Sequence, residues 1–190
     1  MRSQTLMAAA ALALVAAAAH AEPVTYNFDP AHTWTTWEIP HMATSTLRGR
    51  FDRKEGSVTI DRAARTGKLE ITIDTTSINT GVAPFDKHLA SKDFFNVAEF
   101  PTAKFSADQF AFDGEQVKSV TGTLTMLGKT LPLTLTATHF NCYDHPMIKR
   151  QVCGGDFDAT IQRSLWGMAY GIGYSADAVK LHVQVEAVRQ

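Results

Sequence analysis

Short runs in which apolar and polar residues alternate make up most of the chain. The clearest run is Lys68–Asp74, where Leu69, Ile71 and Ile73 share one face and polar side chains occupy the other. A period of two is typical of a strand with one buried face. Such runs recur between turn signals, and strands do not alternate with helical patterns. We therefore predict about eight or nine antiparallel strands, arranged as a sandwich or as a closed up-and-down barrel.

One stretch, Phe85 to Thr102, does not alternate. Its apolar residues follow the spacing of a short amphipathic helix and are Phe85, Leu89, Phe94 and Phe95. Pro101 ends the segment, because the residue before a proline is disfavoured in the α conformation. We expect a short helix followed by a loop across one end of the β-structure. This segment would either plug the end of a barrel or form the lid of a cavity.

The first residues have the pattern of an export signal. Met1-Arg2 is a short positive start, Leu6–Ala19 is an apolar run, and Ala19-His20-Ala21 matches a small-x-small cleavage site. The run is too short for a membrane span, which needs about 20 residues. We therefore predict a signal peptide at residues 1–21 and one mature domain at residues 22–190. With a bacterial-looking signal and no cysteine at the cleavage site, the expected location is the periplasm.

Charge and cysteine content narrow the choice of partners. The net charge is −1 and the charged residues are scattered, which argues against nucleic acid as a partner. The two cysteines, Cys142 and Cys153, predict one structural disulfide in an exported chain. Metal binding by both cysteines together with His145 is the alternative.

Residues that could carry chemistry are few. The histidines form no HxH or HExxH pattern, so only a zinc site from scattered histidines stays open, and no GxSxG motif is present. Asp86 and His88 could act as acid and base or contact a ligand, or Asp86 could be a helix N-cap. Arg163 could pair with Asp86 or Asp93, or it could meet the polar head group of a ligand.

A set of short motifs over nearly the whole mature chain resembles the YceI-like family of exported lipocalin-like proteins that bind polyisoprenoids. Each motif is weak alone, but together they are specific. In chain order they are Asp29-Pro30-Ala31-His32, Ile39-Pro40-His41-Met42, Gly49-Arg50-Phe51, Ser77-Ile78-Asn79-Thr80-Gly81, Asp86-Lys87-His88-Leu89, Asp93-Phe94-Phe95, Phe100-Pro101-Thr102, Gly122-Thr123-Leu124-Thr125, Arg163-Ser164-Leu165-Trp166-Gly167 and Asp177-Ala178-Val179.

The resemblance implies an all-β fold, an extended eight-stranded antiparallel barrel with a short helix near one end. It also implies a long isoprenoid held in the barrel, with its tail in the lumen and its head near the mouth. The residues expected to line the tunnel are Trp37, Ile39, Leu69, Ile71, Ile73, Leu131, Leu133, Leu135, Phe157 and Ile161. The residues expected to cover it are Phe85, Leu89, Phe94 and Phe95, with Asp86, His88 and Arg163 near a polar end. The chain departs from the usual family pattern at Trp34 and Trp37, which would narrow the lumen.

These features favour a non-catalytic periplasmic protein that transports or stores a polyisoprenoid or prenyl quinone. We expect no cofactor, no metal and no nucleic acid, with transient membrane contact and a homodimer as possible associations. One alternative is an enzyme that acts on such a lipid through Asp86 and His88. The other is a stress-related interaction protein whose barrel is filled by its own side chains.

Overall fold

The computed structural model describes residues 22–190, so the predicted signal peptide lies outside the described residues. The elements in chain order are β1 (Val24–Phe28), β2 (Trp34–His41), β3 (Ser45–Phe51), β4 (Lys54–Asp61), β5 (Thr66–Asp74), η1 (Thr75–Ser77), β6 (Ile78–Asn79), α1 (Ala83–Ala90), β7 (Thr102–Asp113), β8 (Gln116–Met126), β9 (Lys129–Asp144), β10 (Gln151–Gln162), η2 (Arg163–Trp166) and β11 (Ala178–Arg189). Within residues 22–190, no helix combines the length and apolar character needed to cross a membrane.

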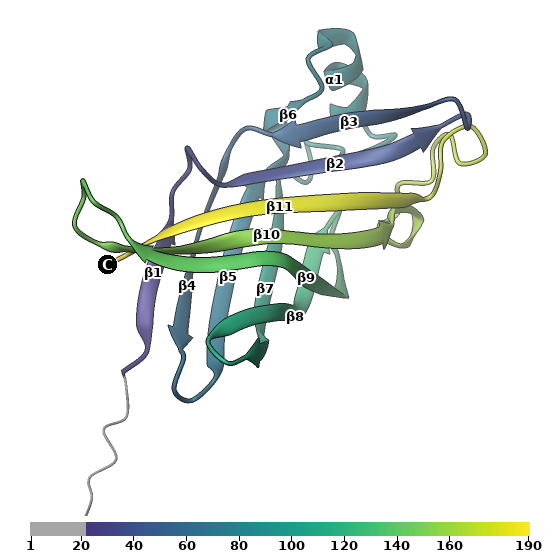
Figure 1. The fold of residues 1–190 in the computed structure, drawn as a ribbon. Helices are drawn as coiled ribbons and strands as arrows, with labels where there is room; N and C mark the ends of the chain where they lie inside the picture. The colour runs from purple at the N-terminus through teal and green to yellow at the C-terminus, as the bar shows by residue number, and fades with distance from the viewer. Residues whose placement is uncertain (1–21) are drawn as a thin grey trace, which may run out of the picture.

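Eight strand positions form one closed antiparallel barrel (Figure 1). The ladder runs β1–β4–β5–β7–β8–β9–β10–β11 and closes because β1 also pairs with β11. At three of these eight strand positions, two shorter strands follow one another along the same line. Both β1 and β2 pair with β11, β3 continues the position of β4, and the short β6 continues that of β5. The predicted eight-stranded up-and-down barrel is therefore confirmed.

The alternating runs place their apolar faces inside the barrel. On β5, Ile71 and Ile73 are buried while Lys68 and Glu70 are exposed, as the period of two predicts. On β9, Leu133 is 9% exposed and the flanking Pro132 and Thr134 face outward. The expectation that Ile71 and Leu133 point to the interior is thus confirmed.

Irregularities in the strand pairing change which residues face inward. On β7 the pairing with β8 shifts between Ala107 and Gln109. On β9 the pairing with β10 shifts between Ala137 and His139. An extra residue in one strand reverses the inside-outside pattern beyond it. The shift on β9 therefore brings Cys142 to the inner side of the barrel.

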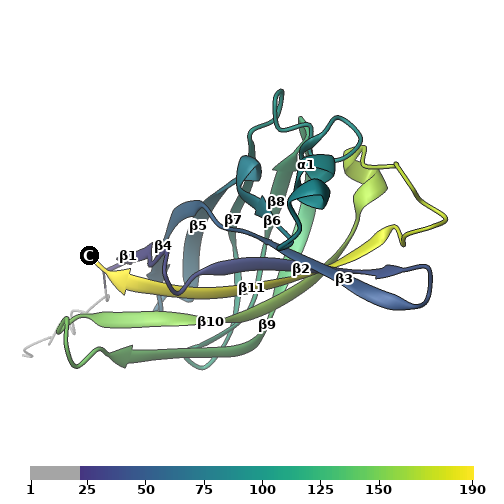
Figure 2. The same cartoon turned by 90° about the horizontal axis from the view of Figure 1, so that it is seen from above.

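The helix lies at one end of the barrel (Figure 2). It begins at Ala83, before the predicted start at Phe85, and Pro84 in its first turn suits that position because its missing N–H is not needed there. It ends at Ala90, so Phe94 and Phe95 are not helical residues as their spacing suggested. They lie in the following turns, where their backbone N–H groups donate to Ser91 and Leu89.

The proposed N-cap at Asp86 is wrong. The helix begins after Val82, which supplies no side-chain cap, and Asp86 lies within the first turn. One carboxylate oxygen of Asp86 accepts hydrogen bonds from the backbone N–H and the hydroxyl of Thr80, at 2.7 and 2.6 Å. Asp86 therefore fixes the loop that leads into α1, and its charge favours the helix N-terminus.

Candidate functional site

A cavity of about 350 Å³ lies inside the barrel beside α1. Its wall is almost entirely apolar and combines inward-facing strand residues with side chains from residues 83–101, which comprise α1 and the turns after it and which we call the α1 segment. The sequence-predicted residues on this wall are Trp37, Ile39, Ile71, Ile73, Phe85, His88, Leu89, Phe94, Phe95, Leu133, Leu135, Ile161 and Arg163. The α1 segment is therefore the cover of a cavity, one of the two arrangements that the sequence left open.

Four sequence-predicted residues lie elsewhere. Leu69 and Phe157 line a second, smaller cavity of about 50 Å³, farther along the barrel. Leu131 and Asp86 line neither cavity. Asp86 and His88 are not brought together, since residues two apart on a helix do not face each other. His88 Nε2 instead lies 3.6 Å from Asp93 Oδ2.

Several wall residues escaped the sequence prediction, namely Thr35, His41, Leu47, Phe51, Ala103, Phe105, Leu124, Met126, Met168, Tyr170, Gly171, Tyr174, Ser175, Val179, Leu181 and Val183. For some of these residues, the alternating strand pattern already indicated an inward position. Thr35 and His41 share the inner face of β2 with Trp37, and Phe105 pairs with Ile71 across the β5–β7 ladder. The loop residues carried no periodic signal that could have placed them.

Arg163 is the buried cation of the cavity wall and is only 3% exposed. Its Nε donates to the Ala176 carbonyl at 3.0 Å, and its Nη1 donates to the carbonyls of Met168 and Tyr170 at 2.7 and 2.8 Å. Burial lowers the pKa of the guanidinium, and the charge of Asp177 opposes that shift. The side chain thus holds the loop after η2 and keeps one nitrogen, Nη2, for another acceptor.

The sequence prediction that Arg163 pairs with Asp86 or Asp93 is wrong. Asp86 bonds to Thr80, and Asp93 lies beside His88. The carboxylate that acts on Arg163 is Asp177, which also accepts hydrogen bonds from the Ser164 hydroxyl and backbone N–H.

Three aromatic side chains gather around this end of the cavity. The rings of His88, Phe94 and Tyr170 meet edge to face, with centroids 5.0 to 5.5 Å apart. The guanidinium carbon of Arg163 lies 6.0 Å from the Phe94 centroid. Tyr170 is 53% exposed and Tyr174 is 70% exposed, yet both line the cavity. The cavity therefore reaches solvent between the loop after η2, the end of β2 and α1.

Unpartnered polar atoms concentrate on the same wall. Among the described residues, the buried side-chain nitrogen and oxygen atoms without a hydrogen-bond partner are Thr35 Oγ1, Trp37 Nε1 and Arg163 Nη2. All three belong to residues that line the main cavity. Buried polar groups normally find a hydrogen-bond partner, so these three atoms are exceptions that call for an explanation. Residues 22–190 contain no cluster of three His, Cys, Asp or Glu side chains suited to a metal ion.

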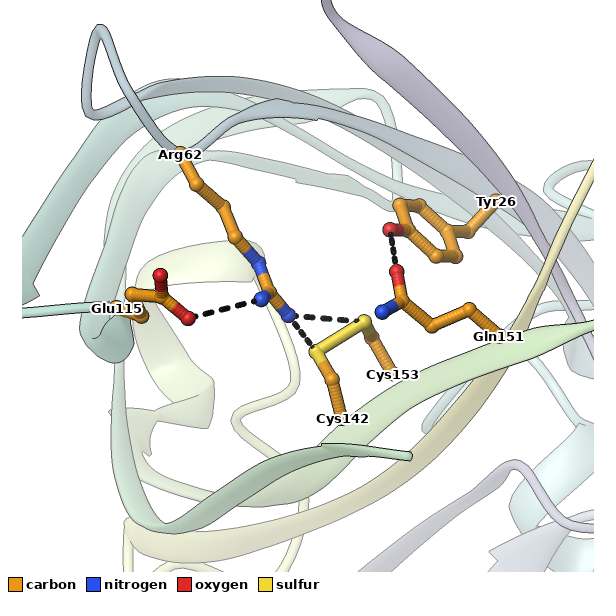
Figure 3. The surroundings of a disulfide bond; sticks show 6 residues. All are labelled: Tyr26, Arg62, Glu115, Cys142, Gln151 and Cys153. Carbon is orange, nitrogen blue, oxygen red and sulfur yellow. Dashed lines mark hydrogen bonds and ion pairs between the residues drawn. A yellow bond between two sulfur atoms is a disulfide. The ribbon is translucent and has the colours of Figure 1, made fainter. Parts of the chain in front are cut away.

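The disulfide lies beside Arg62 of the β4–β5 turn (Figure 3). Cys142 on β9 and Cys153 on β10 face each other in register and are joined, which confirms the predicted bridge. Arg62 reaches both sulfur atoms from the β4–β5 turn, and its Nη1 lies 3.2 Å from a Glu115 carboxylate oxygen. These contacts tie together strand ends that are distant in sequence.

The chain is similar to proteins of several bacteria. A model of the YceI-like domain matches residues 26–187. A UPF0312 protein of Pectobacterium carotovorum is 33% identical, and the alignment covers 100% of both chains. The protein YceI of Escherichia coli O157:H7 is 33% identical over 84% of this chain and 83% of its own.

Solved structures share the barrel. BcnA of Burkholderia cenocepacia matches with a TM-score of 0.66 and 24% identity, over 84% of this chain and 99% of its own. A polyisoprenoid binding domain from Saccharophagus degradans matches with a TM-score of 0.62 and 15% identity, over 88% and 99% of the two chains. These likenesses confirm the fold. Together with the domain match and the relatives of the same length, they show that the chain belongs to the YceI-like family.

Proposed function

We propose that this protein is a non-catalytic periplasmic carrier or store of one isoprenoid lipid, with a prenyl quinone as the favoured ligand. The observation that carries the proposal is the main cavity itself, an apolar space of about 350 Å³ with one buried cation at its open end. Ligand sites commonly combine a mostly apolar wall with a few placed polar groups. An amphiphile with a slim apolar tail and a compact polar head matches this distribution.

The tail supplies most of the affinity. Each buried CH₂ group contributes about 0.8 kcal/mol, so ten such groups contribute about 8 kcal/mol before the costs of binding. A site of this kind needs few polar contacts. The scarcity of charged groups on the cavity wall is consistent with such a ligand.

The head lies at the Arg163 end. Nη2 of Arg163 can donate to a carbonyl or hydroxyl oxygen, and the rings of His88, Phe94 and Tyr170 offer edges and faces to a planar ring. One unpartnered nitrogen on a cation already opposed by Asp177 suits a neutral acceptor such as a quinone carbonyl. The polyisoprenoid binding domain of Saccharophagus degradans has the same fold, which is compatible with a lipid in this barrel.

The first test is organic extraction of the protein purified from a bacterial periplasm after expression with its own leader. The extract is analysed by mass spectrometry and ultraviolet absorption. We expect a prenyl lipid in a stoichiometry near one, with the absorption of a quinone. An empty extract, together with no uptake of added prenyl quinone, would contradict the lipid-carrier function and favour an interaction protein instead.

A matched pair of variants links the lipid to the cavity. Ile161 lines the cavity, and the adjacent Thr160 faces outward on the same strand. Ile161→Phe adds a ring to the cavity and is expected to reduce retained lipid several-fold, whereas Thr160→Phe leaves it unchanged. Equal lipid retention by both variants would place the lipid outside the barrel.

A further inference from the structure

Four side chains divide the barrel interior into two chambers. Ile71, Phe105, Leu135 and Val183 line both the main cavity and the smaller cavity beyond it. They come from four strands, β5, β7, β9 and β11, and each is less than 10% exposed. We call these four residues the waist.

The order of residues along the strands supports this division. On β5, Ile73 lines the main cavity and Leu69 the smaller one, with Ile71 between them. On β11, Leu181 lines the main cavity and Val185 the smaller one, with Val183 between them. The two cavities therefore follow one another along the barrel.

Phe105 is the largest member of the waist. It is 3% exposed and pairs with Ile71 on one side and with Leu124 on the other. An aromatic ring on the inner face of a narrow barrel extends toward the opposite wall, which for β7 is β11, the strand that carries Val183. The ring is therefore the main barrier between the two chambers.

The volume of the main cavity limits the length of the lipid tail that fits between the cavity opening and the waist. A dry apolar cavity of about 150 Å³ holds one benzene, or about 25 Å³ per carbon. The main cavity, at about 350 Å³, then holds about 14 atoms of carbon size, and a quinone head of about eight such atoms leaves room for about one to two isoprene units of tail. The chamber beyond the waist, at about 50 Å³, holds little until the barrier moves.

We propose that Phe105 is a specificity-determining residue that ends the tail chamber. This inference rests on the proposed lipid-binding function. Affinity rises with tail length up to about one to two isoprene units and then levels off, because further units find no space behind Phe105. Removal of the ring joins the chambers, and longer tails then gain contacts.

The test uses prenyl quinones that share one head group and carry one to eight isoprene units. Dissociation constants are measured for the delipidated protein and for Phe105→Ala in the same detergent solution. The ratio of the two constants at each tail length cancels the partitioning of the free lipid into detergent. We expect a ratio near one up to about two units and a gain of at least tenfold for the variant beyond that length.

Two further variants make the result specific. Phe110 lines only the smaller chamber, so Phe110→Ala enlarges that chamber without opening the waist and is expected to show no dependence on tail length. Phe105→Leu, which keeps more of the core packing, is expected to give a smaller gain in the same direction and replaces Phe105→Ala if that variant does not fold.

The two proposals fail in different ways. A ratio that stays constant at all tail lengths, while both proteins bind the quinones, would overturn the role of Phe105 and leave the lipid-binding function intact. If neither protein binds a prenyl quinone of any length, the proposed function itself is wrong.

Discussion

The indole ring of Trp37 lies directly over the backbone of Gly49 on the neighbouring strand. The two residues are cross-strand partners in the β2–β3 ladder, and a side chain at position 49 would collide with the ring. Glycine is therefore required here by the close approach of an aromatic side chain. The ring in turn forms part of the cavity wall, so this pair shapes the site.

Gly49→Ala should displace the Trp37 ring and destabilise the protein by about 1–3 kcal/mol, as overpacking does in other cores. The free energy of unfolding in urea measures the effect. The double variant Gly49→Ala/Trp37→Leu should recover part of the loss, because the smaller side chain leaves room for the methyl group. If the double variant loses as much unfolding free energy as the two single variants together, a direct steric contact is contradicted.

Thr35→Val should stabilise the lipid-free protein by about 1 kcal/mol. The Thr35 hydroxyl is buried on the cavity wall without a partner, and its removal relieves an unmade hydrogen bond. Thr33→Val is the matched control, because the Thr33 hydroxyl donates to the Glu186 carbonyl at 3.1 Å. That variant should lose stability. Destabilisation by Thr35→Val would mean that its hydroxyl has a partner.

Replacement of both Cys142 and Cys153 by alanine should lower the free energy of unfolding by about 3 kcal/mol. The bridge spans a sequence separation of 11, and closing a loop of that size restricts the unfolded chain by about this amount. Urea unfolding of the oxidised protein and the variant provides the comparison. Prenyl quinone affinity should change less than twofold, because Cys153 borders the smaller cavity and neither cysteine lines the main one.

Acid should weaken the fold around η2. Hydrogen bonds from Ser164 hold the pKa of Asp177 below its ordinary value of 3.8, so the carboxylate contributes stability above that value. The contribution is lost as the pH falls through the lower, folded-state pKa. We expect part of the loss of stability below pH 4 to disappear in Asp177→Asn. If the free energy of unfolding of the variant falls with pH as it does in the unchanged protein, this role of Asp177 is contradicted.

Strand faces could be predicted from the sequence because a closed barrel buries one side of every strand. Ile71 and Leu133 follow that rule, and it holds as long as the pairing stays regular. The prediction does not extend past the shift on β9, where the inner face passes from Ala137 to Phe140. A bulge depends on how two strands meet, and neither strand shows it alone.

The polar end of the site was only partly predictable. Arg163 was identified as a candidate, but its partners are the backbone carbonyls of Met168, Tyr170 and Ala176, which leave no mark in the sequence. The loop that carries Tyr170 and Tyr174 has no hydrophobic period. Its position over the cavity follows from the path of the chain between η2 and β11.

The cover of the cavity is attached differently from the rest of the barrel. Among the described residues, the backbone N–H groups of Phe94, Phe95, Val97 and Phe100 donate to carbonyls of the same α1 segment. Apolar contacts, such as the edge-to-face pair of Phe51 and Phe95, hold that segment to the strands, and Thr75 of η1 donates hydrogen bonds to the carbonyls of Phe100 and Pro101 at its C-terminal end. The cover can therefore swing outward without breaking a rung of the sheet. Lipid exchange should consequently be much faster than amide hydrogen exchange in the barrel strands, because loading does not require even partial unfolding of the barrel.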